Sequence, residues 1–149
     1  MTAVYRLHSS RYPANNGRGA AIQGGRWNPK GIEVIYAAAS RPAAVLEILV
    51  HYAVLPRDFV MTLISIPHRL SIIDVPDNVL TPGWDLPIPI PATQEYGRQW
   101  IANGRSAVLR VPSAVVTSEW NYVLNVVHPD FREIMFGPSE PFRFDPRLK

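Results

Sequence analysis

Apolar residues occur along the chain in short runs that are rich in Val, Ile, Tyr and Phe and are bounded by Pro, Gly, Asn or Ser. Runs of this length and composition are typical of β-strands, and a run that is apolar throughout is typical of a strand buried on both faces. The pattern therefore predicts six short strands, over residues 4–7, 34–38, 59–66, 107–111, 121–127 and 133–136.

Two segments are predicted as helices. Ser40 can cap a helix that has Pro42 in its first turn and runs to about Val54. Because nearly every face of this segment carries an apolar side chain, we expect it to be a core helix. The second helix is predicted over residues 93–103, where Gly104 ends it.

The segments between these elements are predicted as loops. Residues 15–19 are expected to form a flexible loop, and residues 72–91, with five prolines, an extended irregular connection. Strands outnumber helices without regular alternation, and no glycine fingerprint opens a helix after the first strand. The pattern argues against a doubly wound dinucleotide-binding fold and favours a single α+β domain over residues 1–149.

Composition narrows the class of protein. The chain is 47% hydrophobic and 18% charged, which is typical of a folded globular protein and not of a disordered one. It has no cysteine, which excludes disulfides and thiolate chemistry. No apolar run approaches the length of a membrane span, and the N-terminal residues lack the regions of a signal peptide. We therefore expect a cytoplasmic protein that does not contact a membrane.

The positive charge comes almost entirely from arginine. The net charge is +3, and lysine occurs only at positions 30 and 149. The planar guanidinium group matches the oxygens of phosphates and carboxylates. Nucleic-acid binding requires a basic helix or a dense basic stripe, whereas these arginines are scattered. Phosphorylated small molecules or an acidic protein partner are therefore favoured over nucleic acid.

The most informative segment is residues 24–31, Gly-Gly-Arg-Trp-Asn-Pro-Lys-Gly. Its glycine pair lets the backbone turn with positive φ or approach a ligand closely. Arg26 and Trp27 therefore lie on a constrained loop, ahead of the buried strand that contains Tyr36. An arginine for a phosphate, an aromatic ring for a base or sugar and the carboxylate of Glu47 for chemistry together predict a nucleotide site. The alternative for Arg26 is an ordinary solvated loop residue.

Glu47 is the strongest single candidate for a catalytic residue. It lies in the middle of the predicted apolar helix, where burying an unpaired carboxylate is costly, so it either faces a cleft or pairs with a cation. The alternative is a single polar stripe along the helix, in which Glu47 and His51 are aligned one turn apart.

Three further side chains have both a functional and a structural interpretation. Arg6 stands inside an apolar strand, where we expect an anionic partner; Tyr36 can pack in the core or contact a ligand. Ser113 can simply begin a turn, or its surroundings can hold its hydroxyl rigidly. The four histidines share no metal-ligand spacing, and nothing supports a hydrolase with an activated serine.

Segments spread over nearly the whole chain occur in the order that is found in one protein family. They are Tyr5-Arg6, Gly24 to Gly31, Val34-Ile35-Tyr36, Ala44-Val45-Leu46-Glu47, Val111-Pro112-Ser113-Ala114, Asn121-Tyr122-Val123-Leu124-Asn125 and His128-Pro129-Asp130-Phe131. On these segments the chain resembles the RES domain, which is named for an Arg, a Glu and a Ser and is found as the toxin of Xre–RES toxin–antitoxin pairs.

The resemblance implies a fold and a set of site residues. The fold is that of ADP-ribosyltransferase toxins, a split β core around an NAD cleft with flanking helices. The catalytic residues are implied to be Arg26, Tyr36, Glu47 and Ser113. Contacts to NAD or phosphate are implied for Arg6, Gly25, Arg26, Trp27, Tyr36, Ser113 and Asn125. Whether Arg6 or Arg26 holds the diphosphate stays open at this point.

The implied activity is cleavage of the nicotinamide–ribose bond of NAD by phosphorolysis or hydrolysis. NAD is the substrate, inorganic phosphate is a candidate co-substrate, and no cofactor or metal is implied. Two alternatives remain: a catalytically inactive module that only binds a nucleotide or a partner, and an enzyme that transfers ADP-ribose to a protein. The implied partner is an Xre-type antitoxin that covers the cleft, and contact with nucleic acid is expected only through that antitoxin.

Overall fold

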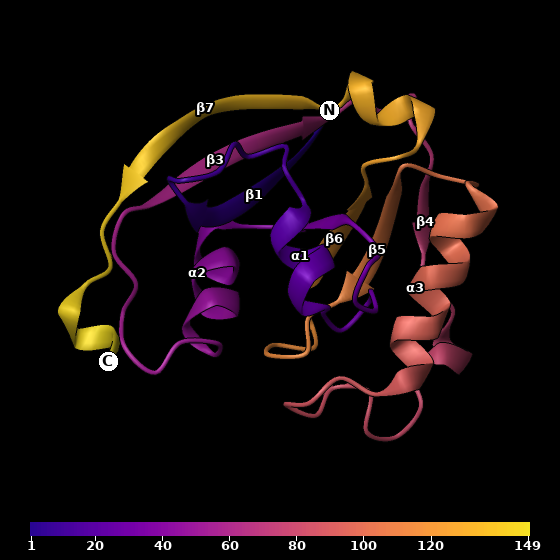
Figure 1. Cartoon of the computed structure of the whole chain (residues 1–149), viewed down its shortest axis with the longest axis horizontal. Coiled ribbons are helices and arrows are strands. Elements are labelled where there is room, and N and C mark those ends of the chain that lie inside the picture. The colour runs from indigo at the N-terminus through magenta and orange to yellow at the C-terminus, as the bar shows by residue number, and fades with distance from the viewer.

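A seven-stranded mixed sheet organises the chain, all 149 residues of which are described by a computed structural model (Figure 1). The strand order is β4-β5-β6-β2-β1-β3-β7, and every neighbouring pair is antiparallel except β4 and β5. The strands are β1 (Thr2–Ser9), β2 (Val34–Ala38), β3 (Phe59–Ile66), β4 (Ile72–Asp74), β5 (Val108–Pro112), β6 (Trp120–Asn125) and β7 (Met135–Phe142).

The sheet is split between β1 and β2. These two strands share one registered pair, Tyr5 with Ala38, whereas β1 and β3 pair along their whole length from Thr2–Ile66 to Ser9–Phe59. Figure 1 shows β1, β3 and β7 running across the top of the molecule while β4, β5 and β6 run down it. The predicted α+β architecture with a split β core is confirmed.

The main core packs between the two halves of the sheet. Val4 and Ile64 come from the β1-β3-β7 half, and Ile35, Val108 and Leu124 come from the other half. All five side chains are fully buried. Burial of each such side chain contributes about 1.5–3 kcal/mol relative to exposure, so this core, rather than the single β1–β2 pair, holds the halves together.

Three α-helices flank the sheet: α1 (Arg18–Gln23), α2 (Arg41–Leu49) and α3 (Pro91–Asn103). Short 3₁₀ turns lie at Asp77–Val79, Pro129–Glu133 and Pro146–Leu148. Helix α2 buries Ala43, Ala44 and Leu49 in a cluster with Leu7 and Ala38 of the sheet. Helix α3 is the longest, and none of the three is long and apolar enough to cross a membrane.

Helix α3 lies directly against the loop of residues 24–31. A Cβ at Gly97 would stand 1.6 Å from the carbonyl oxygen of Trp27, so this position can only be glycine at the observed spacing. Trp100, one turn further along α3, is buried in the same cluster as Trp27 and donates through its indole N–H to Ser106 Oγ at 2.9 Å. Helix α3 therefore fixes the position of the loop of residues 24–31.

Several predicted boundaries were wrong. Helix α2 ends at Leu49 instead of about Val54, and it is not buried all round, since Leu46 is 39% and Val50 56% exposed. Beyond Leu49 the chain leaves the helix, and the Tyr52 ring packs edge-on against Phe59 of β3 with centroids 5.8 Å apart. Residues 18–23 form α1, so Arg18 and Gly19, which were expected in a flexible loop, are helical.

Two of the six strand predictions, over residues 34–38 and 59–66, have the observed bounds, whereas the other four were displaced or wrong in length. The predicted 4–7 strand extends to Thr2–Ser9, and the predicted 133–136 strand begins two residues later, as Met135–Phe142. The connection over 72–91 contains β4 and a 3₁₀ turn. Strand β7 includes Pro138 and Pro141, which a central strand would not tolerate. It tolerates them because it is an edge strand with a register shift opposite Thr62–Ile64.

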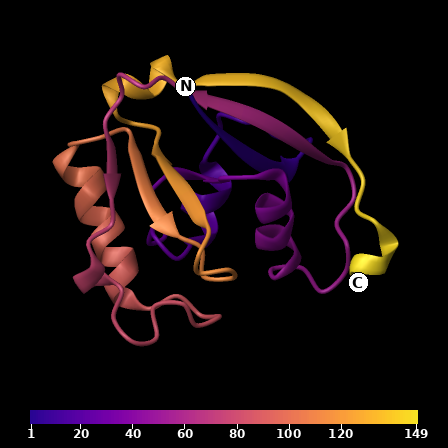
Figure 2. The ribbon, with the colours of Figure 1, turned by 180° about the vertical axis from the view of Figure 1, so that it is seen from behind.

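Four segments gather along one edge of the molecule. In both views the hairpin loop that joins β5 to β6 ends between α2 and the loop of residues 80–90, with α1 on the side seen in Figure 1 (Figures 1 and 2). Residues from this edge include most of the predicted site.

Candidate active site

Glu47 is held by two neutral donors. Ser40 caps α2 by accepting from the Ala43 N–H at 3.2 Å, and the helix then carries Glu47 to the β5–β6 hairpin. There the Ser113 hydroxyl donates to Glu47 Oε1 at 2.7 Å, and Asn121 Nδ2 donates to the same oxygen at 2.9 Å. The other carboxylate oxygen, Oε2, has no protein partner. Of the two predicted surroundings, the cation pair is absent: Glu47 faces a small cavity, and hydrogen bonds orient its carboxylate.

Ser113 is fixed as rigidly as the carboxylate that it binds. It is 3% exposed, and its Oγ accepts from the backbone N–H groups of Val115 and Val116 at 3.0 and 3.1 Å. Its own N–H donates to the carbonyl of Glu119 at 2.8 Å. Both interpretations of Ser113 therefore apply, because the turn that it begins is what aims its hydroxyl at Glu47.

A small cavity of about 80 Å³ lies between α2 and the hairpin, beside Glu47. Its polar lining consists of Ser40, Glu47, Ser113 and Glu119, and its apolar lining includes Leu46. Pockets that enclose a whole drug-sized ligand have volumes of about 300–1,000 Å³. This cavity can therefore receive only one small part of a dinucleotide, and the rest would lie along the open edge of the molecule.

The loop of residues 24–31 is built around Tyr36. The Tyr36 hydroxyl donates to Asn28 Oδ1 at 2.5 Å and accepts from the Trp27 N–H at 3.0 Å. Asn28 is fully buried, and the Gly25 N–H donates to its carbonyl at 2.9 Å. A Cβ at Gly25 would lie 2.7 Å from the Tyr36 hydroxyl, so the close approach requires glycine. Burial raises the pKa of Tyr36 well above its usual range, which keeps the phenol protonated as a donor.

Arg26 projects from this loop and binds a second one. Its Nη1 and Nη2 donate to the carbonyls of Trp84 at 2.5 Å and Leu86 at 2.8 Å. A guanidinium has five N–H donors, so three remain for a ligand. Burial lowers the pKa of Arg26, while the nearby carboxylates of Glu47 and Asp85 oppose that shift. Arg26 is therefore no ordinary solvated loop residue, and it shares its electrostatic surroundings with Glu47.

Comparison with known proteins identifies the family. The sequence model of the RES domain matches residues 3–145. The chain belongs to the RES domain family.

Curated relatives of this RES domain align over most of their length. "Prs ADP-ribosylating toxin" of Sphingobium sp. (strain YBL2) is 36% identical over 138 residues, covering 89% of this chain and 85% of the relative. "Toxin Res" of Photorhabdus laumondii is 39% identical over 135 residues, covering 87% and 85%. "Toxin Res" of Pseudomonas putida is 36% identical over 146 residues, covering 93% and 95%.

A solved structure has the same fold. The toxin–antitoxin complex MbcT–MbcA of M. tuberculosis contains a chain that matches 98% of this RES domain and is itself covered to 85%, with a TM-score of 0.69. The sequence identity is 19%, so this likeness establishes the fold alone.

The two candidate arginines of the RES domain lie in different places. Arg6 Nη1 donates to the carbonyls of Ala14 and of Asn16, the latter at 3.0 Å. Burial lowers the pKa of Arg6 to about 10, and no carboxylate pairs with it. The expected anionic partner was wrong: backbone carbonyls take its place, and Arg6 anchors the loop that follows β1. Of the two arginines, Arg26 is the one beside Glu47.

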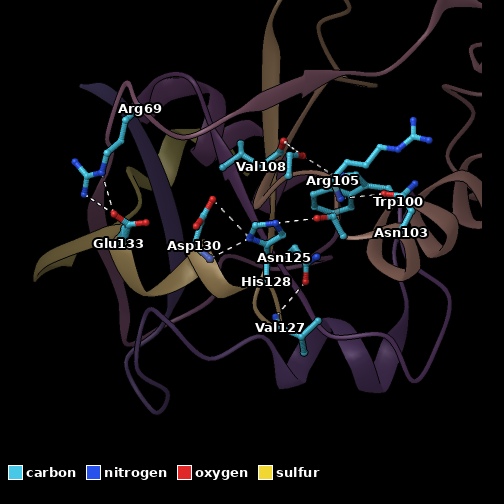
Figure 3. A network of polar contacts seen from close by, with 12 residues as sticks. Arg69, Trp100, Asn103, Arg105, Val108, Asn125, Val127, His128, Asp130 and Glu133 are labelled. Atoms are coloured by element: carbon cyan, nitrogen blue, oxygen red, sulfur yellow. Dashed lines mark hydrogen bonds and ion pairs between the residues drawn. The ribbon is translucent and has the colours of Figure 1, made fainter.

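Two other predicted ligand contacts point into the protein. Trp27 is 2% exposed, and its ring packs edge-on against Tyr96 with centroids 6.3 Å apart. Asn125 is 1% exposed and lies at the opposite end of β6 from Asn121, about 13 Å away at 3.3 Å per residue. Figure 3 shows Asn125 among Val127, His128 and the end of α3, where its Oδ1 accepts from the Val127 N–H at 3.1 Å. In this structure the Trp27 ring packs against α3, and the Asn125 side chain holds the backbone that follows β6.

Asn121 is the site residue that the sequence pattern missed. It stands at the start of β6, directly after the hairpin that begins at Ser113, and its side chain is half-buried. A polar residue at the mouth of a hairpin that contains a candidate serine was the available signal. The structure groups Arg26, Tyr36, Glu47, Ser113 and Asn121 at one edge, while no three His, Asp or Glu side chains gather as a metal site.

Proposed function

We propose that this RES domain is a toxin enzyme that degrades NAD by cleaving the bond between nicotinamide and ribose. The observation that carries the proposal is the carboxylate of Glu47, which is fixed through one oxygen and free at the other, beside a small cavity and close to Arg26. The curated relatives named as toxins, one of them as an ADP-ribosylating toxin, support an activity of this class.

The chemistry requires little beyond these residues. Nicotinamide in NAD is already a cationic leaving group, so its departure needs no general acid. The ribose becomes a cation resembling an oxocarbenium ion, and a fixed carboxylate stabilises that charge strongly in a water-poor site. Glu47 supplies the carboxylate, while Arg26 uses its free N–H donors for the diphosphate through charge-assisted hydrogen bonds. Tyr36 and Ser113 hold the loop and the carboxylate in place.

A second candidate reaction uses the same bond cleavage with a protein side chain as acceptor. The Sphingobium relative, named for ADP-ribosylation of Prs, favours this candidate. Water and inorganic phosphate are the other acceptors, and each gives a different product: ADP-ribose from water, ADP-ribose 1″-phosphate from phosphate, and a modified protein from transfer.

The test is product analysis with purified protein. We expect nicotinamide release from NAD, measured by chromatography with and without phosphate, and the second product identifies the acceptor. Labelled NAD followed by gel electrophoresis of a treated lysate detects transfer to protein. Absence of nicotinamide release in all three conditions contradicts the proposed enzyme and favours a module that binds a nucleotide without cleaving it.

The proposal includes an Xre-type antitoxin as partner, since an enzyme that drains NAD in the cytoplasm harms the cell that makes it. Exposed apolar side chains surround the site on the hairpin, α2 and the 80–90 loop, with Ile88 79% and Leu86 55% exposed. A fold neighbour was solved as a toxin–antitoxin complex. We infer that the antitoxin covers this rim and brings the only contact with nucleic acid.

Competition measures whether the antitoxin covers the site. A non-cleavable NAD analogue titrated into the preformed complex is expected to weaken antitoxin binding, and the association rate should fall as salt screens the arginines. Simultaneous binding without mutual loss of affinity would place the antitoxin at a remote surface.

A further inference from the structure

The two hydrogen bonds to Glu47 have an unusual arrangement, because both donors meet the same oxygen. Ser113 Oγ and Asn121 Nδ2 lie 2.7 and 2.9 Å from Oε1, on segments that come from opposite sides of the hairpin loop. An ionised carboxylate has two oxygens with about four acceptor sites. Two donors on one oxygen therefore fix the rotation of the group and leave the whole of Oε2 for something else.

Asn121 makes this arrangement at a cost to its own side chain. Because Glu47 Oε1 can only accept, the amide must turn its nitrogen toward Glu47, and Oδ1 then faces a buried position with no donor. A buried carbonyl oxygen without a hydrogen bond is unfavourable. Folding alone would favour an apolar residue of the same size at this position, so stability does not explain an asparagine here.

We infer that Asn121 is a positioning residue for Glu47, which together with Ser113 assigns Oε1 to the protein and Oε2 to the ribose of the substrate. This inference rests on the proposed function, since it concerns the same carboxylate. Asn121 contributes the donor that Ser113 alone cannot replace: with one donor the carboxylate can rotate about its terminal bond, and with two it is held in one plane. The charge of Oε2 then faces the developing ribose cation in a fixed direction.

The experiment replaces Asn121 by leucine, which has nearly the same size, and uses a substitution at the next residue as the control. Asn121→Leu removes the donor and also the buried partnerless oxygen, so we expect an unchanged or higher melting temperature, a kcat for nicotinamide release at least about tenfold lower and a KM for NAD within about threefold of wild type. A purely structural role would instead lower the melting temperature. The matched control is Tyr122→Phe, on the neighbouring position of β6 and the opposite face, which is expected to keep the wild-type kcat.

Asn121→Asp supplies a second readout that a structural role would not move. Protonated aspartic acid can donate to Oε1, whereas its carboxylate cannot. We therefore expect the ratio of variant to wild-type kcat to rise as the pH falls from about 8 to 5, while the ratio for Asn121→Leu stays flat. The titratable groups near Glu47 include Arg26, Tyr36, Asp85 and Glu119, and His51 follows four residues later in the chain. All of them are the same in both variants and in the wild type.

The outcomes separate this inference from the proposed function. If wild-type protein releases no nicotinamide, the proposed function fails. If it does, and Asn121→Leu has a wild-type kcat or Asn121→Asp shows no pH-dependent recovery, Asn121 does not position Glu47 and the proposed function stands without it.

Discussion

Replacing Glu47 by glutamine is expected to lower the rate of NAD turnover at least about 100-fold while the fold is kept. The substitution preserves shape, and Ser113 and Asn121 still donate to the oxygen of the new amide. Those two donors force the amide nitrogen into the position of Oε2, so an N–H donor faces the ribose where the wild type has a negative charge. Loss of one such electrostatic contact typically costs about 3–4 kcal/mol in the transition state.

The measurement is single-turnover nicotinamide release, with the melting temperature as the check on folding. Glu140→Gln is the matched control, because Glu140 is exposed on β7, in the other half of the sheet. Near wild-type turnover in a folded Glu47→Gln protein would remove Glu47 from the mechanism.

Arg26→Lys is expected to raise the KM for NAD at least about tenfold although the charge is retained. The guanidinium spans two carbonyls of the 80–90 loop and still has donors for a diphosphate, whereas an ammonium has three donors at a single point. A lysine therefore loses either the hydrogen bonds to the 80–90 loop or the planar contact with phosphate oxygens.

The KM values of the variant and the wild type are compared after their melting temperatures have been shown to be equal. Arg105→Lys is the control, because Arg105 is exposed just beyond the end of α3. The equilibrium affinity for a non-cleavable NAD analogue separates binding from chemistry. A wild-type affinity in Arg26→Lys would indicate that Arg6, and not Arg26, binds the diphosphate.

The sequence was informative where structure follows from local pattern. The buried strand at Val34–Ala38, the Ser40 cap and the end of α3 at Gly104 were predicted because each depends on a few adjacent residues. Helix α1 was missed because distant contacts hold it: Gly31 N–H and Asn28 Nδ2 donate to the carbonyls of Ala21 and Ala20. Nothing in the six residues of α1 alone records those donors.

The site residues that could be predicted were likewise those that local sequence motifs identify. Arg26, Tyr36, Glu47 and Ser113 were chosen from residue type and family motif, and the structure brings them to one edge. Asn121 was not chosen, since its contact with Glu47 joins residues 74 positions apart and exists only once α2 packs beside the hairpin. Trp27 has the residue type of a ligand contact, but close packing against α3 uses its ring for the core.

The two edges of the sheet are both poor templates for another strand. Strand β4 has only three residues, and β7 carries two prolines and a register shift. Exposed strand edges with free N–H and C=O groups recruit other chains into shared sheets and into aggregates. Neither edge of this sheet offers a long, regular row of such groups, so we expect a protein partner to bind through side chains and not by adding a strand. We therefore expect the protein to resist fibre formation even when no partner is bound to it.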